Sequence, residues 1–459
     1  MKVKLTVLGG GGVRSILLAR SIVQRSRDLG IDHVVFMDNN ETKLNIFGAM
    51  SKKAASLIDP DLKFELTTDP VEAVKDADYI ITTIRVGGDE ARVIDERTAL
   101  RYGVLGQETT GASGFAMALR SIPVLKEYCG YISRYAKKDV MVFNFTNPAG
   151  LVTQAMRDLG FEFVYGICDA PSGFLRQLAK CYGQDVKDFE MECFGLNHLS
   201  YYKSIKLKGN DITDELIHSD FLYTDTDMRY FEPELVKRTG CLLNEYLYYY
   251  YYREKPVGNI VAAGSTRGET IQRINSEMIS ELSKIDINKD FDAAMKIFSK
   301  YHFAREASYM ANETSIKRNQ DGHVPVFDIF EKDAGGYAGV ALALIEAKAS
   351  GKSSEMILCV PNNGTVDWLE DGDIVEVSCY IGPDGVRPKK ISELPVIPTN
   401  LIRNVKLYER LTVKSILTKD KQMAIDALTV HPLVNSYSIA KGLVNDYLNA
   451  HKKYAGEWN

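Results

Sequence analysis

The sequence contains no hydrophobic run that approaches the ~20 residues of a transmembrane helix. Its first residues lead directly into a strand-like segment, without the basic region and apolar stretch of a signal peptide. Positive charge is not in excess, since the net charge is −5, so we expect no general attraction to nucleic acids or anionic membranes. These absences predict a cytoplasmic protein whose partners include neither nucleic acid nor a membrane.

Several familiar motifs are also missing. The seven cysteines are an odd number without a C-x-x-C pair, which favours reduced thiols over a disulfide framework. Neither the G-x-S-x-G elbow of serine hydrolases nor the H-E-x-x-H helix of zinc proteases occurs. The 61 acidic residues offer no acid–base pair that composition alone could identify.

A run of glycines follows the first predicted strand, residues 3–8, and precedes a predicted helix over 15–23. Gly9 would make the tight turn and Gly11 would let a pyrophosphate approach the helix N-terminus. Arg14 replaces the third glycine of G-x-G-x-x-G, so the loop alone is equally consistent with a plain strand–helix turn. The residues that we assign to a cofactor in this loop are Gly9, Gly11, Gly12, Val13 and Arg14.

Asp38 follows the second predicted strand, residues 33–37. An acidic residue at this point can hold the ribose hydroxyls of a dinucleotide. The alternative is that Asp38 caps the helix that begins near residue 41. Combined with the glycine loop, Asp38 predicts a site for NAD rather than NADP, because a carboxylate would repel a 2′-phosphate.

Strand and helix patterns alternate through residues 1–166, which predicts a Rossmann-like, doubly wound parallel sheet in an α/β protein. No linker follows, and we expect residues 167–459 to form an interleaved α+β domain that completes the active site. That domain should contain a strand pair over 189–194 and 199–208, a long tyrosine-rich helix over 228–254 and, among its later helices, one near 337–349. The parallel strands are expected at 3–8, 33–37, 63–67, 79–83, 140–144 and 163–167.

Polar side chains follow the later strands, where ligands bind in open α/β sheets. Arg85 follows the fourth strand, Asn147 the fifth, and Cys168 with Asp169 the sixth, while Glu108 lies in a glycine-bounded loop between them. Turn and capping preferences explain Asn147 and Asp169 when each is taken singly. Several such loops on one sheet edge favour a shared cleft.

Cys168 and His198 form a candidate metal pair. Thiolate and imidazole suit transition-series cations, and two protein ligands leave positions for water and a chelating substrate. Their spacing matches no zinc-finger pattern, however, and a histidine between Leu196 and Leu199 is also typical of a protein core.

The assembled motifs resemble the NAD- and metal-dependent family 4 glycosidases, and within them the 6-phospho-β-glucosidase branch. That family is related in fold to lactate and malate dehydrogenases. The resemblance covers nearly the whole chain. Besides the glycine loop, the motifs that carry it are residues 85–88, 106–111, 144–148, 168–171, 195–198, 362–364 and 431–433.

The resemblance implies a route that differs from two-carboxylate glycosidases. NAD⁺ takes a hydride from C3 of the sugar, a base removes the acidified C2 proton, and the C1 leaving group is eliminated. Water then adds to C1 and NADH returns the hydride, while a metal, usually manganese, bridges O2 and O3. The substrate would be a small phosphorylated glycoside, and we expect a homo-oligomer, either a dimer or a tetramer.

The resemblance also assigns roles to single residues. Tyr246 would be the base at C2, although its place in a tyrosine run is equally consistent with packing. An ordinary phenol has a pKa of ~10, so this role requires a nearby cation that favours the phenolate. Arg267 would bind a substrate phosphate, unless it is a solvated residue at a helix end. The metal ligands would be Cys168 and His198, and the sugar contacts Arg85, Glu108, Asn147 and Asn197.

Two departures from the family pattern leave the substrate open. β-Type members usually carry Asn after the cysteine, and α-type members carry Asp followed by Met-Pro. Here Asp169 is followed by Ala170 and Pro171, and an aspartate at this point can protonate a leaving oxygen, so either anomer remains an alternative. Arg14 stands in a loop that commonly continues with Ser or Thr and then Thr-Pro. It can clamp the 6-phosphate or the cofactor, and a non-phosphorylated glycoside remains a further alternative.

Two other classes of function share the cofactor site. A hydroxy-acid or sugar dehydrogenase would produce net NADH, but the His-Gly-Asp motif of lactate and malate dehydrogenases is absent. A non-catalytic NAD sensor would bind ligands without turnover, and the full set of motifs argues against it.

Overall fold

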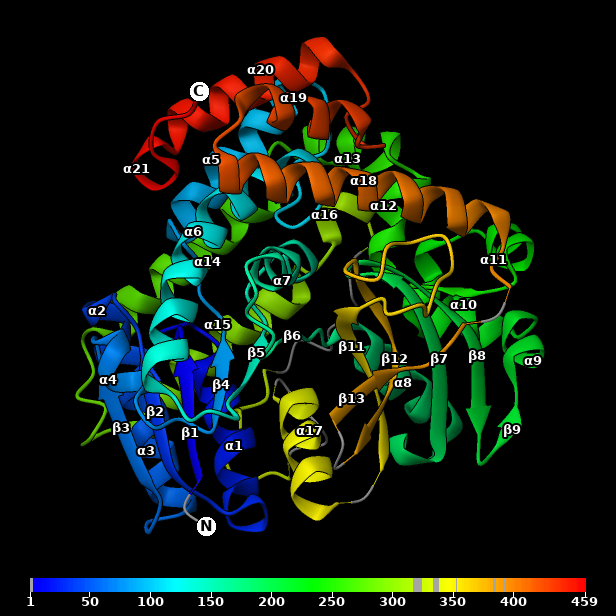
Figure 1. The fold of residues 1–459 in the computed structure, drawn as a ribbon. Helices are drawn as coiled ribbons and strands as arrows, with labels where there is room; N and C mark the ends of the chain where they lie inside the picture. Colours follow the sequence, from blue (N-terminus) through cyan, green and yellow to red (C-terminus); the bar gives the residue numbers. More distant parts are fainter. Residues whose placement is uncertain (1–2, 317–323, 333–337, 352, 383–384, 392) are drawn as a thin grey trace.

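A nine-stranded mixed sheet forms the centre of the molecule, with strand order β13-β12-β11-β6-β5-β4-β1-β2-β3 (Figure 1). The computed structural model describes residues 3–316, 324–332, 338–351, 353–382, 385–391 and 393–459. The run β3-β2-β1-β4-β5-β6 is parallel and has the strand order of dinucleotide-binding folds, which confirms the predicted fold class. These strands are β1 (Val3–Leu8), β2 (Ile31–Met37), β3 (Lys63–Thr67), β4 (Tyr79–Thr82), β5 (Met141–Asn144) and β6 (Val164–Gly166).

Helices connect and cover these strands. They are α1 (Ser15–Leu29), α2 (Glu41–Lys43), η1 (Leu44–Gly48), α3 (Ala49–Ile58), α4 (Pro70–Val74), α5 (Gly88–Arg101), α6 (Gly111–Tyr135), α7 (Ala149–Asp158) and α8 (Ala170–Tyr182). The sequence pattern did not predict α5 or α8. In α5 the buried face carries Arg92, Asp95 and Glu96 in place of an apolar stripe, so the usual helical periodicity of hydrophobic residues is absent.

The chain beyond residue 166 completes the same sheet. Strands β11 (Ser354–Pro361), β12 (Ile374–Gly382) and β13 (Gly385–Pro388) add antiparallel to β6. The expected strand pair is present as β7 (Phe189–Leu196) and β8 (Leu199–Leu207), which form a second sheet with β9 (Asn210–Asp211) and β10 (Leu242–Leu243). The Cys193 N–H donates to Ser378 Oγ at 2.9 Å, which ties the second sheet to the extension of the first.

The single long helix predicted over residues 228–254 is wrong. The segment contains η3 (Asp227–Tyr230), α11 (Pro233–Thr239), β10, η4 (Glu245–Leu247) and α12 (Tyr248–Tyr251), and is followed by α13 (Glu254–Ala263). Pro233 fits only the first turn of a helix, and Gly240 ends α11 in the left-handed region at φ 62°. Asn244 then caps η4 by accepting the Tyr246 N–H at 3.0 Å, which places Tyr246 on a short turn directly after a strand.

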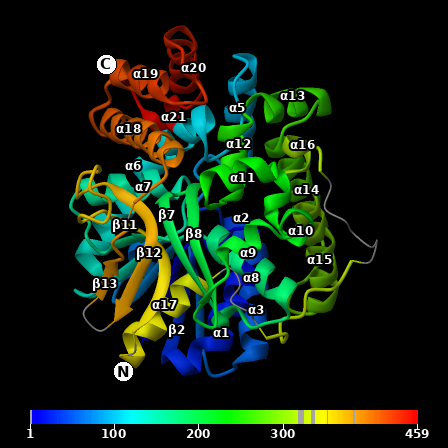
Figure 2. The same ribbon diagram turned by 90° about the vertical axis from the view of Figure 1, so that its right-hand side faces the viewer.

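The remaining helices enclose the sheets. Helices α14 (Arg267–Leu282) and α15 (Phe291–Ala307) pack against each other and against η1 and α3 through a second apolar core that includes Phe47, Met278 and Phe298. Both views show α18 (Val396–Thr418), α19 (Lys421–Val430) and α20 (Tyr437–Ala450) across the top of the molecule (Figures 1 and 2). The others are η2 (Val186–Asp188), α9 (Thr213–Ile217), α10 (Asp220–Asp225), α16 (Ala311–Thr314), α17 (Gly339–Ser350) and α21 (Lys452–Ala455).

The helix expected over 337–349 corresponds to α17, although residue 337 lies outside the described residues. Throughout the described part of the chain, every helix is too short or too polar to cross a bilayer.

Candidate active site

A cavity of about 380 Å³ lies at the carboxyl ends of the parallel strands, where residues after β4, β5 and β6 line it. The fold brings nearly all the predicted site residues to this one cavity. Those that line it are Gly9, Gly12, Val13, Arg14, Arg85, Glu108, Asn147, Cys168, Asp169, His198, Tyr246 and Arg267. Gly11, Asp38 and Asn197 are the predicted residues that do not.

The glycine loop lies so close to neighbouring backbone that larger residues would not fit. Gly9 has φ 106°, and a Cβ there would lie 2.6 Å from the Thr83 carbonyl oxygen. Gly11 donates its N–H to Asp38 Oδ2 at 3.0 Å, and a Cβ on Gly11 would press on the same carboxylate. The loop therefore leaves backbone exposed where a pyrophosphate can approach it closely.

Asp38 does not cap the following helix. Asn40 fills that position instead, because its side chain accepts the Lys43 N–H at 3.0 Å. Asp38 accepts the N–H groups of Gly11 and Asn40, which hold its carboxylate beside the glycine loop. Burial raises the pKa of Asp38 above its ordinary value. This placement fits a dinucleotide ribose, whose hydroxyls would donate to the carboxylate.

Helix α1 begins at the cavity wall with Arg14 at its N-cap position, and no side chain caps this end. The positive end of a helix dipole, at the helix N-terminus, attracts anions. The Arg14 guanidinium lies 3.0 Å from Glu306 of the distant helix α15. The start of α1 thus fits the phosphates of a dinucleotide.

His198 occupies the tight connection between β7 and β8, with φ 62° in the left-handed region. Its Nδ1 lies 3.0 Å from Thr109 Oγ1, whose proton is donated to Gln107 Oε1 at 2.9 Å. Thr109 therefore accepts the Nδ1 proton, and Nε2 keeps the lone pair that a metal requires. Burial lowers the pKa of His198 to about 4, so the imidazole is neutral at pH 7.

Cys168 lies between β6 and α8, on the wall of the same cavity. Burial raises the pKa of its thiol well above the ordinary value, and the nearby Glu376 carboxylate raises it further. A bound cation would reverse this effect by favouring the thiolate. Among the described residues no group of three or more His, Cys, Asp or Glu side chains is arranged to hold a metal. Cys168 and His198 line the same cavity, and a cation held by these two side chains alone would keep open positions for a substrate.

The Tyr246 ring stacks on the His198 ring, with centroids 3.8 Å apart and planes within 4°. This contact places the phenol beside the candidate metal pair. Burial raises the pKa of Tyr246 well above its ordinary value, and Glu245 adds to the effect. Tyr309, which lines the same cavity from beyond the end of α15, donates its hydroxyl proton to Glu245, the neighbour of Tyr246 in the chain.

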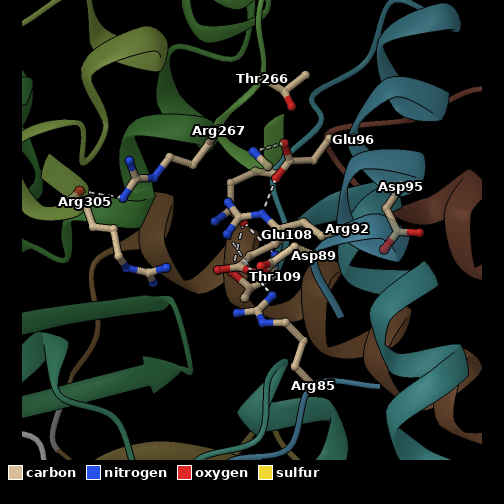
Figure 3. Close-up of polar contacts among 12 residues, drawn as sticks. Arg85, Asp89, Arg92, Asp95, Glu96, Glu108, Thr109, Thr266, Arg267 and Arg305 are labelled. Carbon is tan, nitrogen blue, oxygen red and sulfur yellow. Dashed lines mark hydrogen bonds and ion pairs between the residues drawn. The ribbon is translucent and has the colours of Figure 1, made fainter. Parts of the chain in front are cut away.

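Glu108 is held between two arginines (Figure 3). It forms an ion pair with Arg85 and another with Arg92, at 3.1 Å. Burial alone would raise the pKa of Glu108, but these two guanidinium groups outweigh it and hold the pKa well below its usual range. Glu96 supports Arg92 by accepting its Nε–H at 2.7 Å, and it accepts the Gly268 N–H at 2.6 Å. The side chain at position 108 is therefore a fixed anion that can accept hydrogen bonds from a ligand.

A second group of arginines lies across the cavity. Arg267 donates to the Arg305 carbonyl oxygen at 2.9 Å and to the Ser308 hydroxyl, so it is not a solvated residue at a helix end (Figure 3). Arg305 donates to Asn275 Oδ1 at 2.7 Å. Burial and the neighbouring Arg14 and Arg267 lower the pKa of Arg305 to about 9. Cations that depress one another's pKa in this way form an excess of positive charge that fits a phosphate.

Asn197 is not among the residues that line the cavity. Its side-chain amide donates to Glu376 Oε1 at 2.9 Å. Its amide also lowers the pKa of the nearby Cys168 thiol. Its contact with a substrate stays a prediction.

Sequence reasoning missed Arg92, Arg305 and Tyr309. One local pattern in the sequence could have pointed to Arg92. Asp89 and Arg92 lie one helical turn apart, just after the glycines at 87 and 88. No local pattern points to Arg305 or Tyr309, because only the packing of α15 brings these two residues to the strand ends.

The chain matches known proteins along most of its length. Residues 4–184 match the family 4 glycosyl hydrolases, and residues 193–434 match the C-terminal domain of the same family. A probable 6-phospho-beta-glucosidase of Bacillus subtilis (strain 168) is 30% identical, covering 98% of this chain and 97% of its own length.

Two similar solved structures contain ligands. The 6-phospho-beta glucosidase from Thermotoga maritima with manganese, NAD+ and glucose-6-phosphate is 28% identical, with TM-score 0.81 over 98% of this chain and 99% of its own. A 6-phospho-alpha-glucosidase from gut microorganisms with NAD and glucose-6-phosphate is 26% identical, with TM-score 0.79 over 100% of both chains.

The relation to dehydrogenases is one of fold. A lactate dehydrogenase from a deep-sea metagenome is 13% identical, with TM-score 0.51 over 90% of this chain and 98% of its own. This likeness confirms the expected Rossmann-like architecture. The two family matches cover more than half of the sequence and confirm the resemblance drawn from its motifs. The chain therefore belongs to family 4 of the glycosyl hydrolases.

Proposed function

We propose that the protein hydrolyses 6-phospho-β-glucosides with NAD⁺ and a divalent metal, most simply Mn²⁺. One observation carries the proposal. A single cavity combines a glycine loop at a helix start, Cys168 together with His198, whose ring stacks on Tyr246, and a cluster of arginines. A plain glycosidase needs neither of the first two features, and a plain dehydrogenase does not need the third.

The chain's own residues divide into two binding groups. The glycine loop and the start of α1 hold the pyrophosphate, and Asp38 holds a ribose. Cys168 and His198 hold the metal through sulfur and Nε2. When bound, NAD⁺ supplies a hydride acceptor for C3, and the metal supplies a Lewis acid for the sugar oxygens.

The remaining residues act on the sugar. Tyr246 takes the C2 proton, and Asp169 protonates the leaving oxygen at C1. Arg85, Glu108 and Asn147 bind and orient the sugar hydroxyls. The arginines across the cavity, Arg267 and Arg305, bind the 6-phosphate. Two flanking carboxylates of the usual glycosidase type are not required, because the acidity of C2 replaces oxocarbenium chemistry.

The anomeric preference is the finer part of the proposal. The β form is supported by the 30% identical relative, whose description is a probable 6-phospho-beta-glucosidase. The α form is the second candidate, because Asp169 is the residue expected of the α-type branch and because a 26% identical solved structure is a 6-phospho-alpha-glucosidase.

A substrate panel tests the proposal. The protein is incubated with NAD⁺, Mn²⁺ and nitrophenyl β-glucoside 6-phosphate, with the α-anomer and with both unphosphorylated analogues. We expect nitrophenol release from the phosphorylated β-anomer without net NADH. Net NADH would indicate a dehydrogenase, and binding without turnover a sensor. Faster release from the α-anomer or from an unphosphorylated glycoside would show that this compound, and not the phosphorylated β-anomer, is the preferred substrate.

We further propose a cytoplasmic homo-oligomer, either a dimer or a tetramer. All seven cysteines are free thiols, which supports a reducing compartment. Fractionation of the source cells tests the cytoplasmic location. Light scattering of the purified protein tests the oligomeric state.

A further inference from the structure

A short chain of hydrogen bonds connects three helices at the wall of the cavity. Asn275 of α14 donates its side-chain N–H to Asp89 Oδ2 of α5 at 2.6 Å, and its Oδ1 accepts from Arg305 Nη1 of α15 at 2.7 Å. All three side chains line the cavity, and Asn275 is buried. Because an amide donates through its nitrogen and accepts through its oxygen, the two partners fix which way the Asn275 side chain faces.

The two ends of this chain carry opposite charges. Burial alone would raise the pKa of Asp89, but Arg85 and the hydrogen bond from Asn275 outweigh it and lower the pKa below its ordinary value. Asp89 is therefore a carboxylate. Arg305 is a cation whose buried Nε has no hydrogen-bond partner among the described residues. Opposite charges attract each other strongly away from bulk water, and here the width of one neutral amide group separates them.

The arginines on the two sides of the cavity differ in their counter-charges. Arg85 and Arg92 both form ion pairs with Glu108 (Figure 3). Within the described part of the chain, Arg267 and Arg305 form no ion pair with a carboxylate, and they donate instead to neutral hydroxyl, carbonyl and amide oxygens. A guanidinium without a carboxylate partner suits a phosphate, because a paired one would first have to release its carboxylate.

We propose that Asn275 is a positioning residue for substrate recognition, which holds Arg305 in place and, as a neutral spacer, keeps it from pairing with Asp89. The charge of Arg305 then stays available to the phosphate of the substrate. The preference for phosphorylated over unphosphorylated glycosides therefore depends on an uncharged side chain that does not itself need to contact the substrate. This inference rests on the proposed function, because it presumes that Arg305 binds the 6-phosphate.

Asn275→Leu is the first test of the spacer. The substitution nearly keeps the size of the side chain but removes both hydrogen bonds, so that no amide separates Arg305 from Asp89. The KM for nitrophenyl β-glucoside 6-phosphate should rise about 10-fold, near the lower end of what a hydrogen bond to a charged group contributes. The KM for the unphosphorylated glycoside should change little, and kcat for the phosphorylated glycoside should change less than its KM.

Removal of the competing carboxylate is the second test. When Asn275→Leu is combined with Asp89→Asn, no charge at position 89 is left to pair with Arg305. The KM for the phosphorylated glycoside should then return to within about 2-fold of the value for Asp89→Asn alone, which is the usual precision of such double-mutant comparisons. If Asn275 only fills space between the helices, Asp89→Asn does not repair the loss.

A matched control lies on α15 itself. Ser299 is buried, its hydroxyl accepts the Phe327 N–H at 2.7 Å, and it is not among the residues that line the cavity. Ser299→Ala therefore removes a buried hydrogen bond from the helix that precedes the cavity residue Arg305 without touching the contacts of Asn275. Its KM values for both glycosides should equal those of the wild type, so a loss of stability alone should not alter the substrate preference.

A binding measurement complements the kinetics, because it does not depend on turnover. The enzyme with NAD⁺ bound is titrated with glucose 6-phosphate in a calorimeter. Asn275→Leu should raise the Kd for glucose 6-phosphate about 10-fold. The Kd for NAD⁺, measured in the same way, should stay at the wild-type value.

The outcomes distinguish the spacer from the proposed function. A wild-type KM for the phosphorylated glycoside in Asn275→Leu would overturn the spacer, as would equal losses with both glycosides or a loss that Asp89→Asn does not repair. If Asn275→Leu does not fold, Asn275→Ala removes the same two hydrogen bonds with a smaller side chain and decides by the same comparisons. If Arg305→Met leaves the preference for phosphorylated glycosides unchanged, the phosphate assignment of the proposed function fails, and the spacer with it.

Discussion

In this cavity, the surroundings of each titratable side chain determine its charge state. Glu108 is kept anionic by two arginines, His198 is kept neutral by burial, and Arg305 is made less basic by the cations around it. Each state suits a different role. An anion can accept hydrogen bonds from hydroxyls, a neutral imidazole can bind a metal, and a guanidinium can bind a phosphate.

Asp38→Ala should weaken NAD⁺ binding without unfolding the protein. The carboxylate contributes charge-assisted hydrogen bonds, typically worth about 1.5–3 kcal/mol, so the Kd should rise about 10-fold to 100-fold. Titration calorimetry measures this directly, with circular dichroism as the check on folding. Unchanged affinity would remove Asp38 from the cofactor site.

Cys168→Ser and His198→Ala should each abolish metal retention and activity, because each removes one of only two proposed protein ligands. Metal content after gel filtration, measured by atomic absorption, is independent of turnover. Cys181→Ser is the control, since Cys181 is an exposed thiol outside the cavity. Full activity of the wild type in the presence of a chelator would refute the metal assignment.

Helices are the elements that bring most of the charge to the site. Helix α5 contributes Arg92 and Glu96 from a face that lacks an apolar stripe, and α15 contributes Arg305 from the other side of the cavity. The motifs of the sequence point to loops at the strand ends, and neither α5 nor α15 is such a loop. The ionic part of the site therefore depends on how helices pack.

Arg305→Met tests the role of α15. The substitution keeps an apolar stem and removes a guanidinium, so KM for a phosphorylated glycoside should rise about 10-fold to 100-fold. KM for the unphosphorylated analogue should change little. Arg273→Met, at an exposed residue of the neighbouring α14 that pairs with Glu277 at 3.1 Å, is the control. Equal losses with both substrates would argue against a phosphate contact.

At the scale of the whole molecule, a cluster of buried ionic side chains connects the C-terminal helices to α5 and α6. Arg120 of α6 donates to both carboxylate oxygens of Asp95, at 2.9 and 2.7 Å. His451, which follows α20, lies 2.5 Å from the same carboxylate. Residues 356 positions apart in sequence thus meet at one point on α5.

Asp95→Asn should destabilise the protein strongly, because it leaves the buried Arg120 without its counter-charge. Breaking a buried ion pair in this way costs about 3–5 kcal/mol. Urea unfolding measures the loss. Asp446→Asn removes an exposed carboxylate that pairs with Arg101 at 3.2 Å, and it should cost less than about 1 kcal/mol. Similar losses for both variants would contradict the assignment of Asp95 as the central link.

Stability should also fall in mild acid. Burial lowers the pKa of His431 to about 3, against ~6.5 in an unfolded chain, so the unfolded state binds the proton more tightly. Its contribution is therefore lost as the pH falls from ~6.5 toward 3, by about 2 kcal/mol at pH 5. Urea unfolding at pH 7.5 and pH 5 should show a smaller difference for His431→Asn. An equal pH dependence in the variant would contradict this role.

The sequence by itself determined the Rossmann-like sheet, the glycine loop and the residues that follow the parallel strands. These features are local or periodic, and the carboxyl ends of parallel strands meet at one edge whatever covers the sheet. Only the tertiary structure decided that three C-terminal strands extend the sheet, that the 228–254 segment breaks at Pro233 and Gly240, and that Arg305 and Tyr309 reach the cavity. Contacts such as Arg14 with Glu306 join residues 292 positions apart, and no local pattern encodes them because they depend on how separate helices pack.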